Sequence, residues 1–157
     1  MVSLFFRNLF FTILQPGVVA GLMPYLILGR KRIFETISEM GLIEYTGMIL
    51  LLVGLFIMLH CIVFFAWQGK GTLSPADPTK KLVVAGLYKY SRNPMYVGVM
   101  LILIGETILF HSFGMLLNSI LIFTAFSLFI LKVEEPRLKR DFPDEYVAYL
   151  RQVKRWF

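Results

Sequence analysis

An arginine, an asparagine and a proline stand side by side where a polar segment becomes strongly apolar, within the sequence YKYSRNPMYVG of residues 88–98. Asparagine is among the best N-cap residues and proline suits the first helical position, so we expect Asn93 to cap a helix that begins at Pro94. A helix N-terminus has free N–H groups and a partial positive charge, which attract carboxylates and phosphates. Together with Arg92, this helix end is a candidate anion-binding site. An ordinary capped helix is the alternative.

Two carboxylates, Glu134 and Glu135, follow the apolar region that begins at Pro94. We expect them at a helix C-terminus, where each opposes the helix dipole at a cost of about 0.3–1 kcal/mol. If the apolar region folds back on itself, they lie near Arg92 and form the cation-binding end of the same cleft. Such a cleft suits a zwitterion such as S-adenosylmethionine, which carries an α-carboxylate, an α-ammonium, a sulfonium and a ribose diol. Surface ion pairs are the alternative.

Three further polar residues lie within apolar segments: Glu106, His60 and His111. Glu106 is about 12 residues into its helix, roughly 18 Å from the start at about 1.5 Å per residue. A carboxylate at membrane depth is a candidate functional group, but we expect Glu106 to reach the outer interface. The two histidines are far apart and match no zinc-ligand spacing, so we expect no metal site.

The composition is that of an integral membrane protein. Of the 157 residues, 57% are hydrophobic and 17% are charged, whereas soluble domains have about 45–50% apolar and about 25% charged residues. We expect a single domain over residues 1–157, with two N-terminal spans in 1–68 and the candidate site in 69–157. The net charge of +6 does not indicate nucleic acid, because basic residues set orientation in membrane proteins.

Apolar segments predict an all-α, polytopic fold with about four transmembrane helices. Residues 4–28 form a candidate span with a kink at Pro16, and residues 45–69 form a span without formal charge. Residues 95–131 are too long for one crossing, since a single helix would reach about 55 Å against a hydrocarbon core of about 30 Å. They therefore predict a hairpin of two helices, with its turn at residues 111–114.

Basic residues are distributed unequally between the two predicted sides. Arg30, Lys31 and Arg32 lie on one side. The other side holds the remaining 13 of the 16 basic residues: Arg7, Lys70, Lys80, Lys81, Lys89, Arg92, Lys132, Arg137, Lys139, Arg140, Arg151, Lys154 and Arg155. The positive-inside rule places that side, with both termini and the candidate site, in the cytoplasm.

A C-terminal amphipathic helix is predicted to begin at Pro143. Its first turn contains acidic residues, and we expect Lys154 and Arg155 in its last turn, where they favour the helix dipole. Tyr146 and Tyr149 belong to one apolar face. We expect this helix against the membrane or over the end of the hairpin.

Two stretches carry a family resemblance: GKGTLSPADPTKKLVVAGLYKYSRNPMYVG (69–98) and EEPRLKRDFPDEYVAYLRQVKRW (134–156). They contain, in order, a Leu-Val pair, Gly-x-Tyr, Arg-Asn-Pro-x-Tyr-x-Gly, an acidic pair and Phe-x-x-Glu-Tyr-x-x-Tyr. From residue 69 to residue 157 the chain resembles the membrane-embedded methyltransferases that include isoprenylcysteine carboxyl methyltransferase and phospholipid N-methyltransferases. Asn93 stands where the isoprenylcysteine enzymes usually have histidine, which is similar to the phospholipid branch.

The resemblance implies an S-adenosylmethionine-dependent methyltransferase that acts on a lipid or lipid-linked acceptor. It implies catalytic roles for Arg92, Glu134 and Glu135. It also implies a cofactor pocket lined by Leu82, Val83, Tyr88, Arg92, Asn93, Pro94, Tyr96 and Glu134. We expect membrane lipids as partners, and a homo-oligomer in which a second copy completes the substrate region is one alternative. The acceptor class stays open between carboxyl and phospholipid-amine methylation, and a non-catalytic membrane scaffold that retains the fold is a further alternative.

Overall fold

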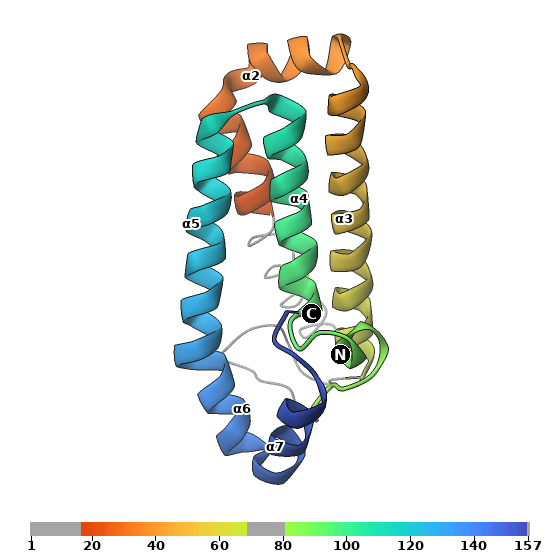
Figure 1. Cartoon of the computed structure of the whole chain (residues 1–157), viewed down its shortest axis with the longest axis vertical. Coiled ribbons are helices and arrows are strands. Elements are labelled where there is room, and N and C mark those ends of the chain that lie inside the picture. Colours follow the sequence, from red (N-terminus) through yellow and green to blue (C-terminus); the bar gives the residue numbers. More distant parts are fainter. Residues whose placement is uncertain (1–16, 69–80, 157) are drawn as a thin grey trace, which may run out of the picture.

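The computed structural model describes residues 17–68 and 81–156 of the chain, and this part is helical, without strands. The elements in chain order are the π-helix η1 (Val18–Leu22), α2 (Met23–Ser38), α3 (Leu42–Gln68), the 3₁₀-helix η2 (Gly86–Lys89), α4 (Pro94–Phe110), α5 (Phe113–Phe129), the π-helix η3 (Ile130–Glu134), α6 (Glu135–Asp141) and α7 (Pro143–Gln152). Long helices α3, α4 and α5 run along the molecule, and α6 and α7 lie at one end (Figure 1). The all-α prediction is confirmed for the described residues.

Two segments of the described part are long and apolar enough to cross a membrane, Leu42–Phe64 and Phe113–Asp141. Helix α4 is equally apolar, but its 17 residues are at the lower end of the length that a spanning helix needs. The first predicted span, 4–28, and its kink at Pro16 fall mostly outside the described residues. The predicted number of four spans is therefore not confirmed.

Helices α3 and α4 pack with their backbones almost in contact. A Cβ atom on Gly98 would lie 2.8 Å from the Met58 backbone nitrogen, and one on Gly105 would lie 2.6 Å from the Leu51 nitrogen. Small residues allow this close approach, which drives helix association in membranes where the hydrophobic effect does not. The α3–α4 pair is thus the rigid support on which the N-terminus of α4 is placed.

The hairpin turn lies where the sequence predicts it. His111 adopts the left-handed conformation (φ 45°) that ends α4, and the Ser112 side chain caps α5 by accepting a hydrogen bond from the Met115 backbone N–H at 3.4 Å. Arg32 of α2 donates to the Phe110 carbonyl at 3.2 Å. These contacts satisfy helix-end groups that would otherwise be unpaired.

The prediction that a helix ends at Glu134 and Glu135 is wrong. Helix α5 continues through the π-helix η3 into α6, so the helical segment runs from Phe113 to Asp141. The ring of Pro136 would clash with the Lys132 carbonyl in a regular α-helix, and a π-turn at this point accommodates the proline. Glu135 is consequently the first residue of α6, inside a continuous helical segment and not at a helix end.

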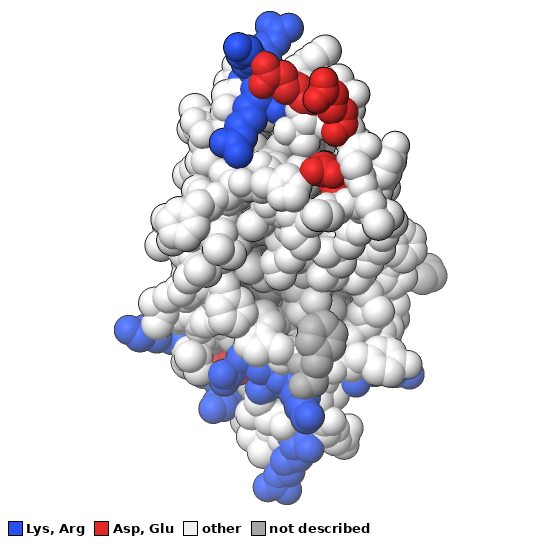
Figure 2. Space-filling view, turned by 45° about the horizontal axis from the view of Figure 1, so that its top comes forward, with Lys and Arg blue, Asp and Glu red and all other residues white. Residues whose placement is uncertain are grey.

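Charged side chains gather at the two ends of the molecule, with an uncharged band between them (Figure 2). We name these the turn end, at the α2–α3 corner and the hairpin turn, and the cavity end, around α6 and α7. Arg30, Lys31 and Arg32 belong to α2 at the turn end, and Lys31 forms an ion pair with Glu35 there. The structure therefore separates the minority basic cluster from Arg92, as the sequence predicts.

Candidate functional site

A small polar cavity lies at the cavity end, enclosed by the loop before α4, the η3–α6 junction and α7. Its volume is about 50 Å³, and it is lined by Leu82, Val83, Tyr88, Arg92, Asn93, Ile130, Glu134, Glu135, Arg137, Leu138, Tyr146 and Tyr149. The loop is fixed against α3 by a small core of Cys61, Val83 and Tyr88. Seven of the nine residues predicted from the sequence line this cavity.

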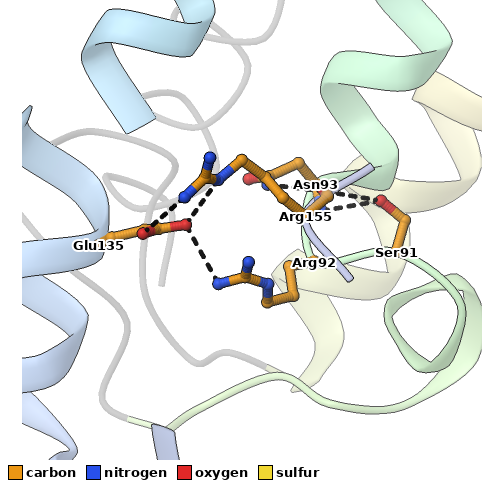
Figure 3. Close-up of polar contacts among 5 residues, drawn as sticks. All are labelled: Ser91, Arg92, Asn93, Glu135 and Arg155. Atoms are coloured by element: carbon orange, nitrogen blue, oxygen red, sulfur yellow. Dashed lines mark hydrogen bonds and ion pairs between the residues drawn. The ribbon is translucent and has the colours of Figure 1, made fainter. Parts of the chain in front are cut away.

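Glu135 is the centre of a buried ion-pair cluster. Its Oε1 atom accepts hydrogen bonds from Arg92 Nη1 at 3.1 Å and from Arg155 Nε at 2.9 Å, and its Oε2 atom accepts one from Arg155 Nη2 at 3.1 Å (Figure 3). The side chains of Arg92 and Glu135 are 11% and 10% exposed. Both oxygens of this carboxylate are therefore engaged by cations, as a buried charge requires.

Tyr96 and Glu134 form the adjacent part of the site. The Tyr96 hydroxyl donates to Glu134 Oε2 at 3.1 Å, and the Tyr96 ring packs on Phe126 with a centroid distance of 4.7 Å. Tyr96 is the third residue of α4, and Glu134 is the last residue of η3. The hydrogen bond thus joins the beginning of α4 to the helix that returns from the hairpin turn.

The predicted helix start at Pro94 is confirmed, but the predicted side-chain cap is wrong. Asn93 occupies the N-cap position, yet its amide donates to the Arg155 carbonyl at 3.0 Å. Ser91 Oγ donates to the same carbonyl at 3.2 Å, and the Arg92 backbone N–H donates to the Lys154 carbonyl at 3.0 Å. Asn93 therefore binds the segment after α7, because the two carbonyls of that segment need donors.

Two tyrosines of α7, Tyr146 and Tyr149, line the side of the cavity that faces α7. The Tyr149 hydroxyl donates to the Tyr88 carbonyl at 2.6 Å, and both Tyr146 and Tyr149 are buried. Burial raises the pKa of the Tyr146 phenol, and the nearby Glu135 carboxylate adds to this rise. Burial also raises the pKa of Tyr149. The cavity therefore lies in a low-dielectric environment.

Helix α7 ends at Gln152, so the prediction that Lys154 and Arg155 form its last turn is wrong. Val153 is extended (φ −126°, ψ 131°), which directs the chain back across the loop before α4. The Arg155 guanidinium thereby reaches Glu135, and this contact raises the pKa of Arg155. Arg155 was not identified from the sequence, because its role depends on how the chain leaves α7.

Two buried donors at the cavity have no acceptor. Within the described part of the chain, no residue accepts a hydrogen bond from Arg92 Nε or from Arg137 Nε, and both side chains line the cavity. Buried donors without a partner are costly, so a water, an ion or a ligand oxygen is expected at these positions. The donors and the two carboxylates together suit a ligand that carries an anion and a cation.

Glu106 is not at the outer interface, so this prediction is wrong. The residue is 4% exposed, because α4 packs against α2, α3 and α5 and encloses its side chain. No described residue donates a hydrogen bond to Glu106 Oε2. Glu106 does not line the polar cavity and plays no part in the candidate site.

The fold and the site together define a class of protein: an apolar helical bundle with a buried Arg-Glu-Arg cluster at the end of a hairpin. The family model described as phospholipid methyltransferase matches residues 42–145, about two thirds of the chain. The chain belongs to the phospholipid methyltransferase family, a membrane-associated group of methyltransferases of the phospholipid and isoprenylcysteine type. Searches of the curated proteins and of the solved structures gave no match.

Proposed function

We propose that this protein transfers a methyl group from S-adenosylmethionine to a lipid or lipid-linked acceptor. The observation that carries the proposal is the convergence of Arg92, Glu134 and Glu135 at one cavity in a chain that belongs to this family. These residues are separated by about forty positions in the sequence.

The donors and acceptors of the cavity fit the two charged ends of the cofactor. The Nε atoms of Arg92 and Arg137, which have no acceptor among the described residues, would hold its carboxylate, and Glu134 or Glu135 would hold its ammonium. Bound there, S-adenosylmethionine supplies a methyl group on a positively charged sulfur. The protein's task is then to orient the acceptor and to provide a matched electrostatic field.

The acceptor determines whether a base is needed. A carboxylate acceptor is already ionised at neutral pH, whereas an amine acceptor must first lose a proton. Glu134, which accepts a hydrogen bond from Tyr96, is the residue that we assign as this base. The Asn93-Pro94 pair is similar to the phospholipid branch, so we favour an amine in a lipid headgroup over a carboxyl group.

The cavity end is proposed to face the cytoplasm, with the turn end on the opposite side. The unequal distribution of basic residues supports this orientation. A lipid acceptor would then reach the cavity laterally from the cytoplasmic leaflet, because the surrounding helices are apolar.

Binding of S-adenosylhomocysteine to the purified protein tests the cofactor assignment. We expect Arg92→Ala and Glu134→Gln each to raise Kd about tenfold or more, equivalent to about 1.4 kcal/mol. Arg32→Ala is the matched control, since this arginine also binds helix-end groups but lies at the turn end. Unchanged affinity in both cavity variants, or equal losses in the control, would contradict the assignment.

The methyl acceptor is tested with labelled S-adenosylmethionine and fractionated membrane lipids. We expect label in the lipid fraction, with kcat/KM rising with pH through the pKa of the amine or its base. A carboxyl acceptor would instead show little pH dependence above about pH 6. Label that enters only water-soluble molecules would refute lateral entry of a lipid.

A further inference from the structure

The cavity is too small for the ligand that its residues suit. Its volume is about 50 Å³, whereas pockets for ligands of this size are about 300–1,000 Å³. One of the two carboxylates that could hold a ligand cation is also occupied, because Glu135 already binds Arg92 and Arg155. The structure is therefore a closed state, and part of the cavity wall must move before a ligand can enter.

Residues 153–156, which we name the strap, lie against Arg92, Asn93 and Glu135 of the cavity lining and are held there by hydrogen bonds. The Lys154 carbonyl accepts from the Arg92 N–H at 3.0 Å, and the Arg155 carbonyl accepts from Asn93 at 3.0 Å and from Ser91 at 3.2 Å. The Arg155 side chain then takes the place on Glu135 that a ligand cation would need. Withdrawal of the strap would free Glu135 and open the cavity together.

The last residue of the strap, Trp156, also lines an apolar groove. This groove of about 590 Å³ lies between α4 and α5, and it is lined by Val97, Met100, Leu101, Ile104, Leu116, Ser119, Ile120, Phe123 and Trp156. The Trp156 ring lies 5.3 Å from the Phe123 ring. The one polar side chain among these, Ser119, is engaged with the Met115 carbonyl at 2.9 Å. Trp156 thus connects the groove directly to Arg155.

A single aliphatic chain of a membrane lipid is the occupant that this groove fits. Apart from Ser119, which is already hydrogen-bonded, and the Trp156 indole N–H, its lining is hydrophobic, which suits hydrocarbon better than a polar ligand. The exposed residues beside it on α5, such as Leu117 and Leu121, are also apolar, and α5 belongs to a segment long enough to cross a membrane. A chain that fills the groove would contact the Trp156 indole, because this ring is part of the groove lining and packs on Phe123.

We propose that the strap is a latch: an aliphatic chain in the α4–α5 groove displaces Trp156, which withdraws Arg155 from Glu135 and opens the polar cavity. The latch rests on the proposed function in one respect, that the cavity receives S-adenosylmethionine. The latch also implies an order of binding: the lipid chain binds in the groove first, and the cofactor then binds in the opened cavity. A cofactor that meets only the closed state binds weakly, because its apparent Kd is the intrinsic Kd divided by the open fraction.

The test uses the full chain with Trp67→Phe, so that Trp156 is the only tryptophan, purified in digitonin, which lacks a flexible aliphatic chain. Binding of S-adenosylhomocysteine and Trp156 emission are both measured with and without palmitoyl lysophosphatidylcholine. If about a tenth of the molecules are open without lysolipid, its addition should lower Kd about tenfold. Trp156 emission should shift to longer wavelength as the indole leaves the groove.

Variants separate the latch from a general effect of lipid. Trp156→Ala should bind S-adenosylhomocysteine tightly without lysolipid and respond little to it. Gln152→Ala, just before the strap, and Leu121→Ala, exposed on α5 outside the groove, should respond as the parent does. An equal response to lysolipid in the parent and in Trp156→Ala, or no emission shift in the parent, would overturn the latch.

Failure of the proposed function gives a different result. If no variant binds S-adenosylhomocysteine, Trp156→Ala included, the cofactor assignment is refuted. An emission shift under that condition would still support release of the strap by lipid. Tight binding in the parent without lysolipid would support the cofactor and overturn the latch.

Discussion

The turn end and the cavity end of the molecule both have arginines and glutamates at the ends of helices, yet the two clusters are built differently. At the turn end, Arg32 donates to the Phe110 and His111 carbonyls at 3.2 and 3.4 Å, and His111 Nε2 lies 2.6 Å from Glu44 Oε1. The His111 side chain is 52% exposed. These contacts satisfy helix ends within reach of water, so they need no ligand.

At the cavity end, the corresponding groups are buried and incompletely satisfied. Arg92 and Glu135 are about one-tenth exposed, and the Nε atoms of Arg92 and Arg137 have no acceptor among the described residues. A charged residue at a helix end is therefore not evidence for a site by itself. Buried ion pairs together with unused guanidinium donors distinguish the cavity end among the described residues, and each of the following predictions tests that difference.

The largest expected contrast is in accessibility from the two sides of the membrane. In a Cys61→Ser background, Gln152→Cys should be labelled by a membrane-impermeant thiol reagent only from the cytoplasm, and Ser38→Cys only from the opposite side. Both positions are exposed; Ser38 ends α2 and Gln152 ends α7, and these helices lie at opposite ends of the structure (Figure 1). Labelling of both cysteines from the same side would show that the two ends do not face different compartments.

Removal of one carboxylate from each end should affect stability unequally. Glu135→Ala leaves Arg92 buried without its partner, and breaking a buried ion pair costs about 3–5 kcal/mol. Glu44→Ala should lower Tm much less, because water can replace the contact with the exposed His111. Thermal unfolding in detergent measures the Tm of both variants. Equal losses of Tm would contradict the prediction that the cavity-end carboxylate is buried and the turn-end carboxylate is within reach of water.

Two matched glycine substitutions should separate stability from binding. An alanine Cβ at Gly98 would lie 2.8 Å from the Met58 nitrogen, and one at Gly105 would lie 2.6 Å from the Leu51 nitrogen. Each should therefore force α3 and α4 apart at a cost of about 1–3 kcal/mol. Only Gly98→Ala lies next to the start of α4, so only this variant should also weaken binding of S-adenosylhomocysteine.

The control for this pair is Gly21→Ala, since nothing lies within 4 Å of a Cβ at that position. It should leave both Tm and binding close to those of the parent. Equal weakening of binding by Gly98→Ala and Gly105→Ala would show that the cavity depends on the whole helix pair and not on its nearer part.

The smallest expected effect is a loss of stability at alkaline pH. Burial raises the pKa of Tyr146 and Tyr149 in the folded protein, whereas an unfolded tyrosine ionises at about pH 10. Their contribution to stability is therefore complete below about pH 10 and is lost as pH rises through the folded pKa. Hydrogen exchange should show α7 opening before the turn end, and Tyr146→Phe should reduce this sensitivity. Simultaneous opening of both ends would contradict the prediction.

The sequence was sufficient for features that depend on neighbouring residues. Pro94 begins α4, and the hairpin turn lies at His111 and Ser112, because proline geometry and turn-forming residues act over a few positions. The structure also brings seven of the nine candidate residues to one cavity, while their functional roles stay a prediction. The candidates were chosen from the motif order and not from physical reasoning about any single residue.

What the sequence could not provide is the identity of each polar group's partner. Asn93 has the properties of an N-cap, but the carbonyl of Arg155 lies close enough to take its amide. Glu106 could have reached the surface from an isolated helix, but the packed bundle encloses it. In each case a distant segment offered a partner or a barrier that local propensity does not include.

The sequence by itself determined that the chain is apolar and helical, and it predicts that most basic residues lie on one side of a membrane. Composition and local pattern fix these properties, because they follow from solvation and from contacts within a few residues. Only the tertiary structure decided that α5 continues past Glu134, that Arg155 binds Glu135 and that Trp156 connects the cavity to an apolar groove. These contacts join segments about 20 to 60 positions apart, and packing of the whole bundle selects them because each buried charge must find a partner.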